Sequence, residues 1–113
     1  MKKGPEIFLQ YIFESIEIIE SYTAHLTKSE FLSNLQAQDS VIRRLEIIGE
    51  ASKGLPASLK KAHPEIPWKQ VAGLRDILIH EYFGVDLQIL WPIVKKDLPA
   101  LKKVILKNLN GRL

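Results

Sequence analysis

Arg75, His80 and Tyr82 are the residues of this sequence whose types and spacing are best suited to chemistry. A guanidinium can stabilise negative charge, and an imidazole can exchange a proton near neutral pH. On a helical wheel that advances about 100° per residue, Tyr82 lies about 20° from Arg75, whereas His80 lies roughly 140° away. The arginine and the histidine therefore do not converge easily from one straight helix. They could do so if the helix loosens near its end, as Gly84 permits, or if two copies of it face each other across a dimer axis.

Each of these residues also has a purely structural explanation. Arg75 lies in the middle of an apolar stripe, where a charge is costly unless it reaches water or pairs with a carboxylate such as Glu46 or Glu50. A histidine near a helix C-terminus is often only a favourable partner for the helix dipole. A tyrosine on the same stripe usually belongs to a core or an interface. Taken one at a time, the three residues do not identify a site.

The elements that must position these residues are all predicted to be helices. Apolar residues recur at helical spacing, and capping or stop residues delimit the segments. The predicted fold class is all-α: a bundle of four main helices plus short helical turns around one core, in a single domain over residues 1–113. The main helices are expected over 5–23, 34–53, 68–83 and 87–109, with a short helix after Thr27 and one or two turns over 56–62.

Glycines and prolines predict where these helices end, bend or approach one another. Gly54 ends the second main helix and Gly84 the third, while Pro92 and Pro99 bend or interrupt the last. Gly49 costs about 1 kcal/mol relative to alanine within a helix, so it indicates a close helix approach.

We expect the second and third main helices to form a two-fold interface, because Trp68 and Ile79 lie beside Arg75. The alternative explanation is that Gly49 allows close helix packing within a single chain and takes no part in an interface between two copies.

Composition bounds the class of protein. Hydrophobic residues make up 46% and charged residues 26% of the 113, which excludes a disordered chain. The absence of cysteine excludes a disulfide scaffold, a thiolate metal site and a cysteine nucleophile. No apolar run approaches the roughly 18 residues that span a bilayer, and no signal-peptide core follows the N-terminus. A cytoplasmic protein without membrane association is expected.

The charges are unevenly distributed along the chain. Residues 1–56 carry six basic and eight acidic side chains, a balance of −2, whereas residues 57–113 carry ten basic and five acidic ones, a balance of +5. A basic half suits a polyanion such as RNA. A solvated, lysine-rich last helix is the alternative explanation.

The segment 75–82 resembles the R-x4-H-x-Y motif of the HepT-like branch of the HEPN domains. The resemblance extends from about residue 6 to 109. Arg44 departs from the pattern because an asparagine is expected there, and Pro92 departs because that helix usually lacks a proline. The further matching segments are 38–51 (the second helix of the family), 63–68 and 82–86 (which flank the motif helix) and 97–99 (the last-helix signature).

This resemblance implies a homodimeric, metal-independent endoribonuclease that needs no cofactor and acts as the toxin of a two-gene module. RNA carries its own nucleophile, the 2′-hydroxyl, so the enzyme needs a proton acceptor and a cation for the phosphorane charge. His80 suits the first role and Arg75 the second. The expected products are a 2′,3′-cyclic phosphate and a 5′-hydroxyl. A two-fold axis would gather two arginines and two histidines in one basic cleft.

The resemblance also implies a protein partner. The usual partner resembles a minimal nucleotidyltransferase, which neutralises the toxin by attaching AMP to the motif tyrosine, here Tyr82. Two alternatives to a ribonuclease toxin stay open. One is a non-catalytic helical dimer that binds RNA or a nucleotidyltransferase, and the other is a purely structural helical oligomer.

Residues on the second main helix are candidates for a supporting role. Asp39 and Glu46 lie two turns apart and could orient Arg75 or His80, and Arg43 is a further candidate. A solvated or ion-paired helix face explains them equally well. The histidines show no zinc spacing and no acidic cluster has metal-loop spacing, so no metal site is predicted.

Overall fold

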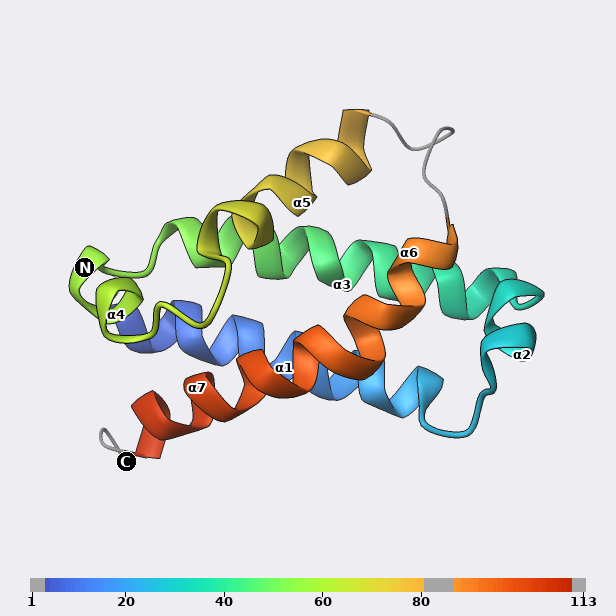
Figure 1. Cartoon of the computed structure of the whole chain (residues 1–113), viewed down its shortest axis with the longest axis horizontal. Coiled ribbons are helices and arrows are strands. Elements are labelled where there is room, and N and C mark those ends of the chain that lie inside the picture. Colours follow the sequence, from blue (N-terminus) through green and yellow to red (C-terminus); the bar gives the residue numbers. More distant parts are fainter. Residues whose placement is uncertain (1–3, 81–86, 111–113) are drawn as a thin grey trace.

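The computed structural model describes residues 4–80 and 87–110, and this part of the chain folds into helices joined by short turns (Figure 1). The all-α prediction is therefore confirmed. No helix in these ranges is both long and apolar enough to cross a membrane. The helices are α1 (Pro5–Thr23), α2 (Lys28–Leu32), α3 (Leu35–Lys53), α4 (Ala57–Ala62), α5 (Trp68–His80), α6 (Leu87–Pro92), a π-helical turn (Ile93–Asp97) and α7 (Leu98–Asn110).

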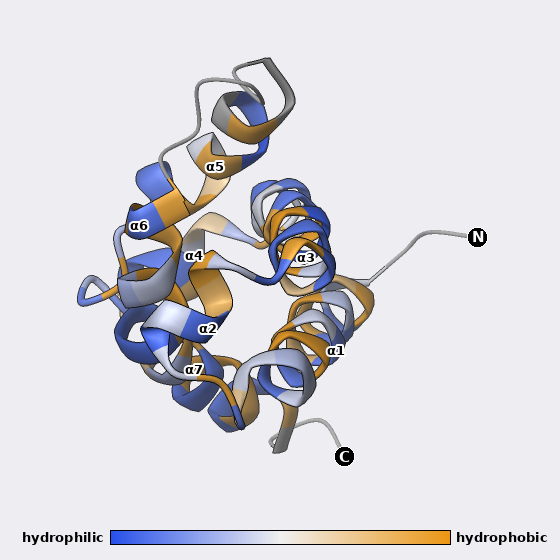
Figure 2. Ribbon diagram, turned by 90° about the vertical axis from the view of Figure 1, so that its right-hand side faces the viewer, coloured by the Kyte–Doolittle hydropathy of each residue, from blue (hydrophilic) through white to orange (hydrophobic). Residues whose placement is uncertain are grey.

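Three helix pairs build the bundle. α1 and α3 lie antiparallel, α5 packs on α3, and α7 crosses α1 (Figure 1). Figure 2 shows hydrophilic and hydrophobic segments alternating along α1 and α3, as expected of helices with one buried face. Burying one large aliphatic side chain contributes about 1.5–3 kcal/mol. The fully buried residues of these helices include Leu9, Ile12, Ile16, Ile19, Val41, Leu45, Ile48, Leu78 and Ile105.

Local capping explains where α2 and α3 begin. The backbone N–H of Glu30 donates to the hydroxyl of Thr27 at 3.1 Å, and the N–H of Thr27 donates to the Glu30 carboxylate at 2.9 Å. This capping box confirms the predicted start of the short helix. Asn34 caps α3 by accepting a hydrogen bond from the N–H of Ala37 at 3.0 Å.

α3 ends at Gly54, as predicted, but for a different reason. Gly54 has φ of −84°, in the right-handed region, so the chain does not use the left-handed conformation that glycine permits. A Cβ atom at Gly54 would instead lie 2.7 Å from the ring of Phe8. The glycine therefore allows the aromatic ring of α1 to lie against the end of α3.

The last helix is interrupted between its two prolines, as predicted. The π-helical turn follows Pro92, and the N–H of Leu98 donates to the carbonyl of Ile93, five residues back. In a regular α-helix the ring of Pro99 would clash with the carbonyl of Lys95. The wider turn accommodates that ring.

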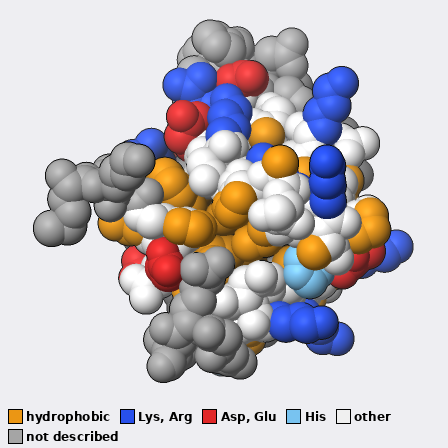
Figure 3. Space-filling model, turned by 90° about the vertical axis from the view of Figure 1, so that its left-hand side faces the viewer, with side chains coloured by type: hydrophobic (Ala, Val, Ile, Leu, Met, Phe, Trp, Pro, Cys, Tyr) orange, Lys and Arg blue, Asp and Glu red, His pale blue; other side chains and the backbone are white. Residues whose placement is uncertain are grey.

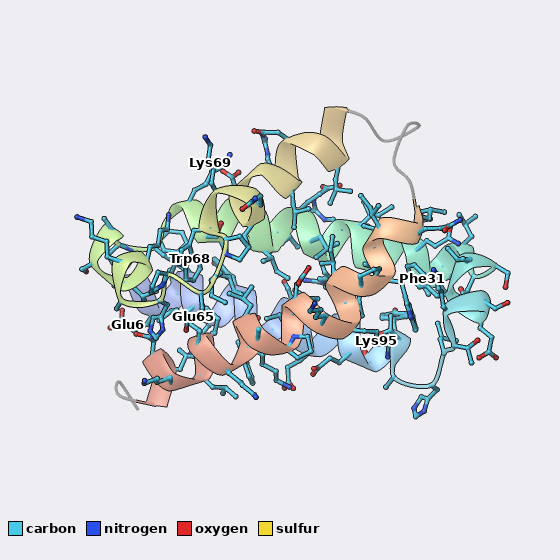
Figure 4. All side chains as sticks on the ribbon, viewed as in Figure 1. Glu6, Phe31, Glu65, Trp68, Lys69 and Lys95 are labelled. Carbon is cyan, nitrogen blue, oxygen red and sulfur yellow. The ribbon has the colours of Figure 1, made fainter. Side chains whose placement is uncertain are left out.

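Two lysines of the basic half, residues 57–113, contact α1. The ammonium group of Lys102 in α7 lies 2.7 Å from a Glu20 oxygen and 3.3 Å from a Glu17 oxygen of α1. The hydrogen bond to Glu20 is the main cause that raises the pKa of Lys102 above its ordinary value. Lys95 donates to the carbonyl of Thr23, the last residue of α1, and its ammonium lies 4.8 Å from the Trp91 ring centroid (Figure 4).

The remaining basic side chains are not gathered in one patch on the end of the molecule that Figure 3 displays. Lysine and arginine side chains are scattered around the edges of that face, with hydrophobic side chains toward its middle. The excess positive charge of residues 57–113 is therefore partly structural and, on this face, dispersed.

Candidate functional site

A groove with a volume of about 690 Å³ lies where α1, α3 and α5 meet. It combines aromatic side chains with charges of both signs. α1 provides the aromatic rings, α3 provides most of the wall, and α5 provides an arginine. Its lining residues are Phe8, Tyr11, Arg43, Glu46, Ile47, Glu50, Ala51, Lys53, Gly54 and Arg75.

The structure places the guanidinium of Arg75 at this groove, in contact with carboxylates. Its Nε lies 3.4 Å from an oxygen of Glu50, and one terminal nitrogen lies 3.1 Å from an oxygen of Asp76. The predicted pairing of Arg75 with α3 is confirmed for Glu50, whereas Glu46 pairs with Arg43 at 3.5 Å. Because 39% of the Arg75 side chain remains exposed, an incoming anion can reach the guanidinium.

The close approach predicted at Gly49 positions the backbone of Arg75. A Cβ atom at Gly49 would lie 3.0 Å from both the carbonyl oxygen of Val71 and the backbone nitrogen of Arg75. α3 and α5 therefore touch backbone to backbone at this level. The contact is made within one chain, which is the alternative explanation for Gly49, so this glycine gives no support to an interface between two copies.

His80 is the last residue of α5. Five residues of α-helix separate its backbone from that of Arg75 by about 7.5 Å along the axis. α5 is helical throughout Trp68–His80, so the helix does not loosen between the two residues. The His80 side chain, Tyr82 and Gly84 lie outside the described residues, and the convergence of the three motif side chains stays a prediction.

The candidate supporting residues separate into two groups. Glu46 and Arg43 line the groove with Arg75, and Glu46 is the more buried of the two. Asp39 does not line it, because it lies three turns before Glu50, about 16 Å away along the axis of α3. The structure therefore does not bring Asp39 to Arg75. Arg44, the departure from the family pattern, is also absent from the lining.

Sequence reasoning missed Phe8, Tyr11 and Lys53 as groove residues. The two aromatic residues lie in the segment 5–23, for which only a helix was predicted. The antiparallel packing that brings them to the end of α3 joins residues more than forty positions apart, and no local pattern signals it. Among the described residues, no three histidine, aspartate or glutamate side chains form a group that could hold a metal ion.

Comparison with known proteins identifies the family. The family described as "Ribonuclease HepT-like" matches residues 12–107. The chain is 51% identical over 102 residues to the "Probable ribonuclease HepT" of Thermococcus cleftensis, which covers 90% of this chain and 93% of that protein. It is 53% identical over 107 residues to a "Gamma-glutamylcyclotransferase and putative RNase" of Methanocaldococcus jannaschii, which covers 95% of this chain.

The match covers only 48% of the Methanocaldococcus jannaschii protein, so the chain spans about half the length of that relative. No solved structure matches the chain. The family match includes α3, α5 and the whole segment 75–82, which carries the arginine, histidine and tyrosine of the motif. The chain belongs to the HepT-like family.

Proposed function

We propose that this protein is a metal-independent, cytoplasmic endoribonuclease and the toxin of a two-gene module. The observation that carries the proposal is the partly exposed guanidinium of Arg75 at a groove that also holds Arg43 and Lys53, in a chain of the HepT-like family. The three cations are paired with Glu46, Glu50 and Asp76 in partly exposed ion pairs, which an RNA phosphate can replace. The names of the two relatives supply the class of substrate, RNA.

The proposed reaction uses groups of the RNA and of the motif. The 2′-oxygen attacks the adjacent phosphorus while His80 accepts the hydroxyl proton. Arg75 stabilises the negative charge that develops on the phosphorane oxygens. The bond from phosphorus to the 5′-oxygen then breaks, and that oxygen takes a proton from an imidazolium or from water. The products are a 2′,3′-cyclic phosphate and a 5′-hydroxyl.

The regularity of α5 supports a dimeric site. Because α5 is helical from Arg75 to His80, the helical period places these two positions roughly 140° apart around its axis. In the proposed homodimer, the histidine of one copy works with the arginine of the other. A two-fold axis then places two such sets in one cleft.

The dimer is tested by light scattering of the purified chain. At tens of micromolar and physiological salt, the scattering mass should be twice the 12.9 kDa of one chain. A strictly monomeric protein under these conditions would contradict the dimeric site.

The ribonuclease activity is tested with total RNA in the presence of EDTA. We expect cleavage that is unchanged by the chelator, with fragments that end in a 2′,3′-cyclic phosphate and begin with a 5′-hydroxyl. Sequencing of both RNA ends identifies these groups. Binding of RNA without any cleavage would identify the non-catalytic helical dimer instead, and loss of activity with EDTA would contradict a metal-independent reaction.

Tyr82 is the proposed control point of the enzyme. A nucleotidyltransferase partner would transfer AMP from ATP to the phenol oxygen, releasing pyrophosphate. The adduct adds bulk and a negative phosphate near the place where the substrate phosphate binds, so RNA meets a steric block and like charge.

Replacing Tyr82 with phenylalanine should preserve cleavage but prevent neutralisation, because the variant lacks the acceptor oxygen. The experiment incubates both proteins with the nucleotidyltransferase of the neighbouring gene and ATP, and then measures intact mass. Only the wild type should gain mass and lose activity. An equal mass gain in the variant would remove Tyr82 from the mechanism, and an inactive variant would move it from regulation to catalysis.

A further inference from the structure

Tyr11 is an exposed aromatic residue at the groove. The residue is 40% exposed and lies about 120° around the helix from the buried stripe of α1. Phe8, one turn earlier, is only half-buried but its ring is lodged against Gly54, where a Cβ atom would lie within 2.7 Å of it. The Phe8 ring therefore packs against the end of α3, whereas the Tyr11 ring stays partly exposed to solvent.

The packing of α1 on α3 places Tyr11 near the ion pair of Arg75. α1 and α3 are antiparallel, and Phe8 meets Gly54 at the end of α3. One turn further along α1 therefore faces one turn back along α3, which is the level of Glu50. The Glu50 carboxylate lies 3.4 Å from Arg75, and all of these residues line the same groove.

The charges around Tyr11 suit a nucleic-acid backbone. Arg43 pairs with Glu46 at 3.5 Å and Lys53 pairs with Glu50 at 3.6 Å, but the two cationic side chains are 71% and 43% exposed, so phosphates in the groove can reach both. An aromatic face beside cations is the arrangement on which single-stranded nucleic acids bind, because every unpaired base has a face that can stack. In a duplex the base faces are covered by their neighbours.

We propose that Tyr11 is a base-stacking residue that makes the enzyme select single-stranded RNA. A base next to the scissile phosphate stacks on the phenol ring, while Arg43 and Lys53 contact the flanking phosphates. The stacked base holds the strand with its phosphate toward Arg75. This inference rests on the proposed ribonuclease function and adds to it the substrate class and the residue that recognises it.

The test compares Tyr11 with Tyr22, the other exposed tyrosine of α1. Tyr22 is 44% exposed and lies eleven residues further on, about 16 Å along the axis on nearly the same helix face, and it does not line the groove. The probe is a fluorescein-labelled RNA strand with 2′-O-methyl groups, which cannot supply the nucleophile. Its binding is followed by fluorescence anisotropy, alone and annealed to its complement.

Tyr11→Ala should weaken binding of the single strand by about 5- to 150-fold, the equivalent of ~1–3 kcal/mol per stacked base. Tyr11→Phe should bind like the wild type because it keeps the ring, whereas Tyr11→Leu, which fills the same space without an aromatic face, should bind like Tyr11→Ala. Tyr22→Ala should bind the single strand like the wild type. All of the variants should bind the duplex with the same affinity as the wild type.

Three results would overturn the inference: equal binding by Tyr11→Ala and Tyr22→Ala, weak binding by Tyr11→Phe, or an equal loss on the duplex. Cleavage of unmodified RNA by the same variants shows whether the stacking role of Tyr11 or the proposed ribonuclease function is wrong. If Tyr11→Ala cleaves single strands as fast as the wild type, the stacking role is wrong and the ribonuclease stands. If the wild type binds the probe through Tyr11 but cleaves no RNA, the stacking role stands and the ribonuclease is wrong.

Discussion

Replacing either Arg75 or His80 with alanine should abolish visible RNA cleavage while the helical bundle stays folded. A positioned general acid or base contributes about 10²–10⁴-fold in rate, and loss of one group that stabilises an oxyanion costs about 10²–10³-fold. The effect on stability should be small. Arg75 is partly exposed and its pair with Glu50 lies at the surface, where ion pairs contribute about 0–1 kcal/mol.

The measurement is the initial rate of cleavage of one labelled RNA strand, with circular dichroism melting of each variant alongside. Arg43→Ala is a matched control, because it removes a groove arginine outside the motif and should weaken RNA binding without abolishing the reaction. Activity like that of the wild type in Arg75→Ala or His80→Ala would contradict the assignment. Unfolding of both variants would favour the structural explanation of these residues.

Adding side chains at Gly49 and at Gly73 should change stability in opposite directions. Gly73→Ala meets no atom within 4 Å and gains helix propensity, so the variant should be about 1 kcal/mol more stable. Gly49→Val gains propensity too, but its Cβ would lie 3.0 Å from two backbone atoms of α5, which cannot move separately from the helix. Overpacking of this kind costs about 1–3 kcal/mol or more.

Thermal unfolding followed by circular dichroism measures both changes, at roughly 4 °C per kcal/mol for a domain of this size. Gly49→Val should also lose cleavage activity, because the added side chain displaces the helix that presents Arg75. Gly73→Ala should keep it. A Gly49→Val protein as stable and active as the wild type would show that the contact between α3 and α5 does not position the arginine.

Features set by neighbouring residues were the ones that the sequence predicted well. The capping box at Thr27 and Glu30 and the interruption between Pro92 and Pro99 depend on a few consecutive residues, and both are present as expected. The end of α3 at Gly54 was also predicted, but for the wrong reason. The prediction relied on the backbone freedom of glycine, whereas the structure needs a glycine there because the ring of Phe8 lies where a Cβ atom would be. A ring from another helix leaves no local signal in the chain.

The candidate site could be predicted only in part. Arg75 was identified from its place in an apolar stripe and from the motif, and a carboxylate partner on α3 was anticipated. Tyr11 was not, because its position at the groove depends on how α1 meets α3. The basic half suggested a polyanion surface, yet Lys95 and Lys102 are engaged in contacts with α1. Such long-range pairs follow from packing and not from periodicity.

The π-helical turn keeps the two halves of the last helix in phase. The buried residues Leu90, Val94 and Leu98 are four positions apart, and in a regular α-helix each such step overshoots a full turn by about 40°. The wider turn rotates less per residue and offsets this extra rotation, so the apolar stripe continues straight into α7. A π-helical turn holds one residue more than the α-helical turn that it replaces, so a chain one residue shorter would return to a regular α-helix here, with Leu101 still facing the core and Lys102 still facing α1. In that regular helix the ring of Pro99 would clash with the carbonyl four residues before it, which the present turn avoids.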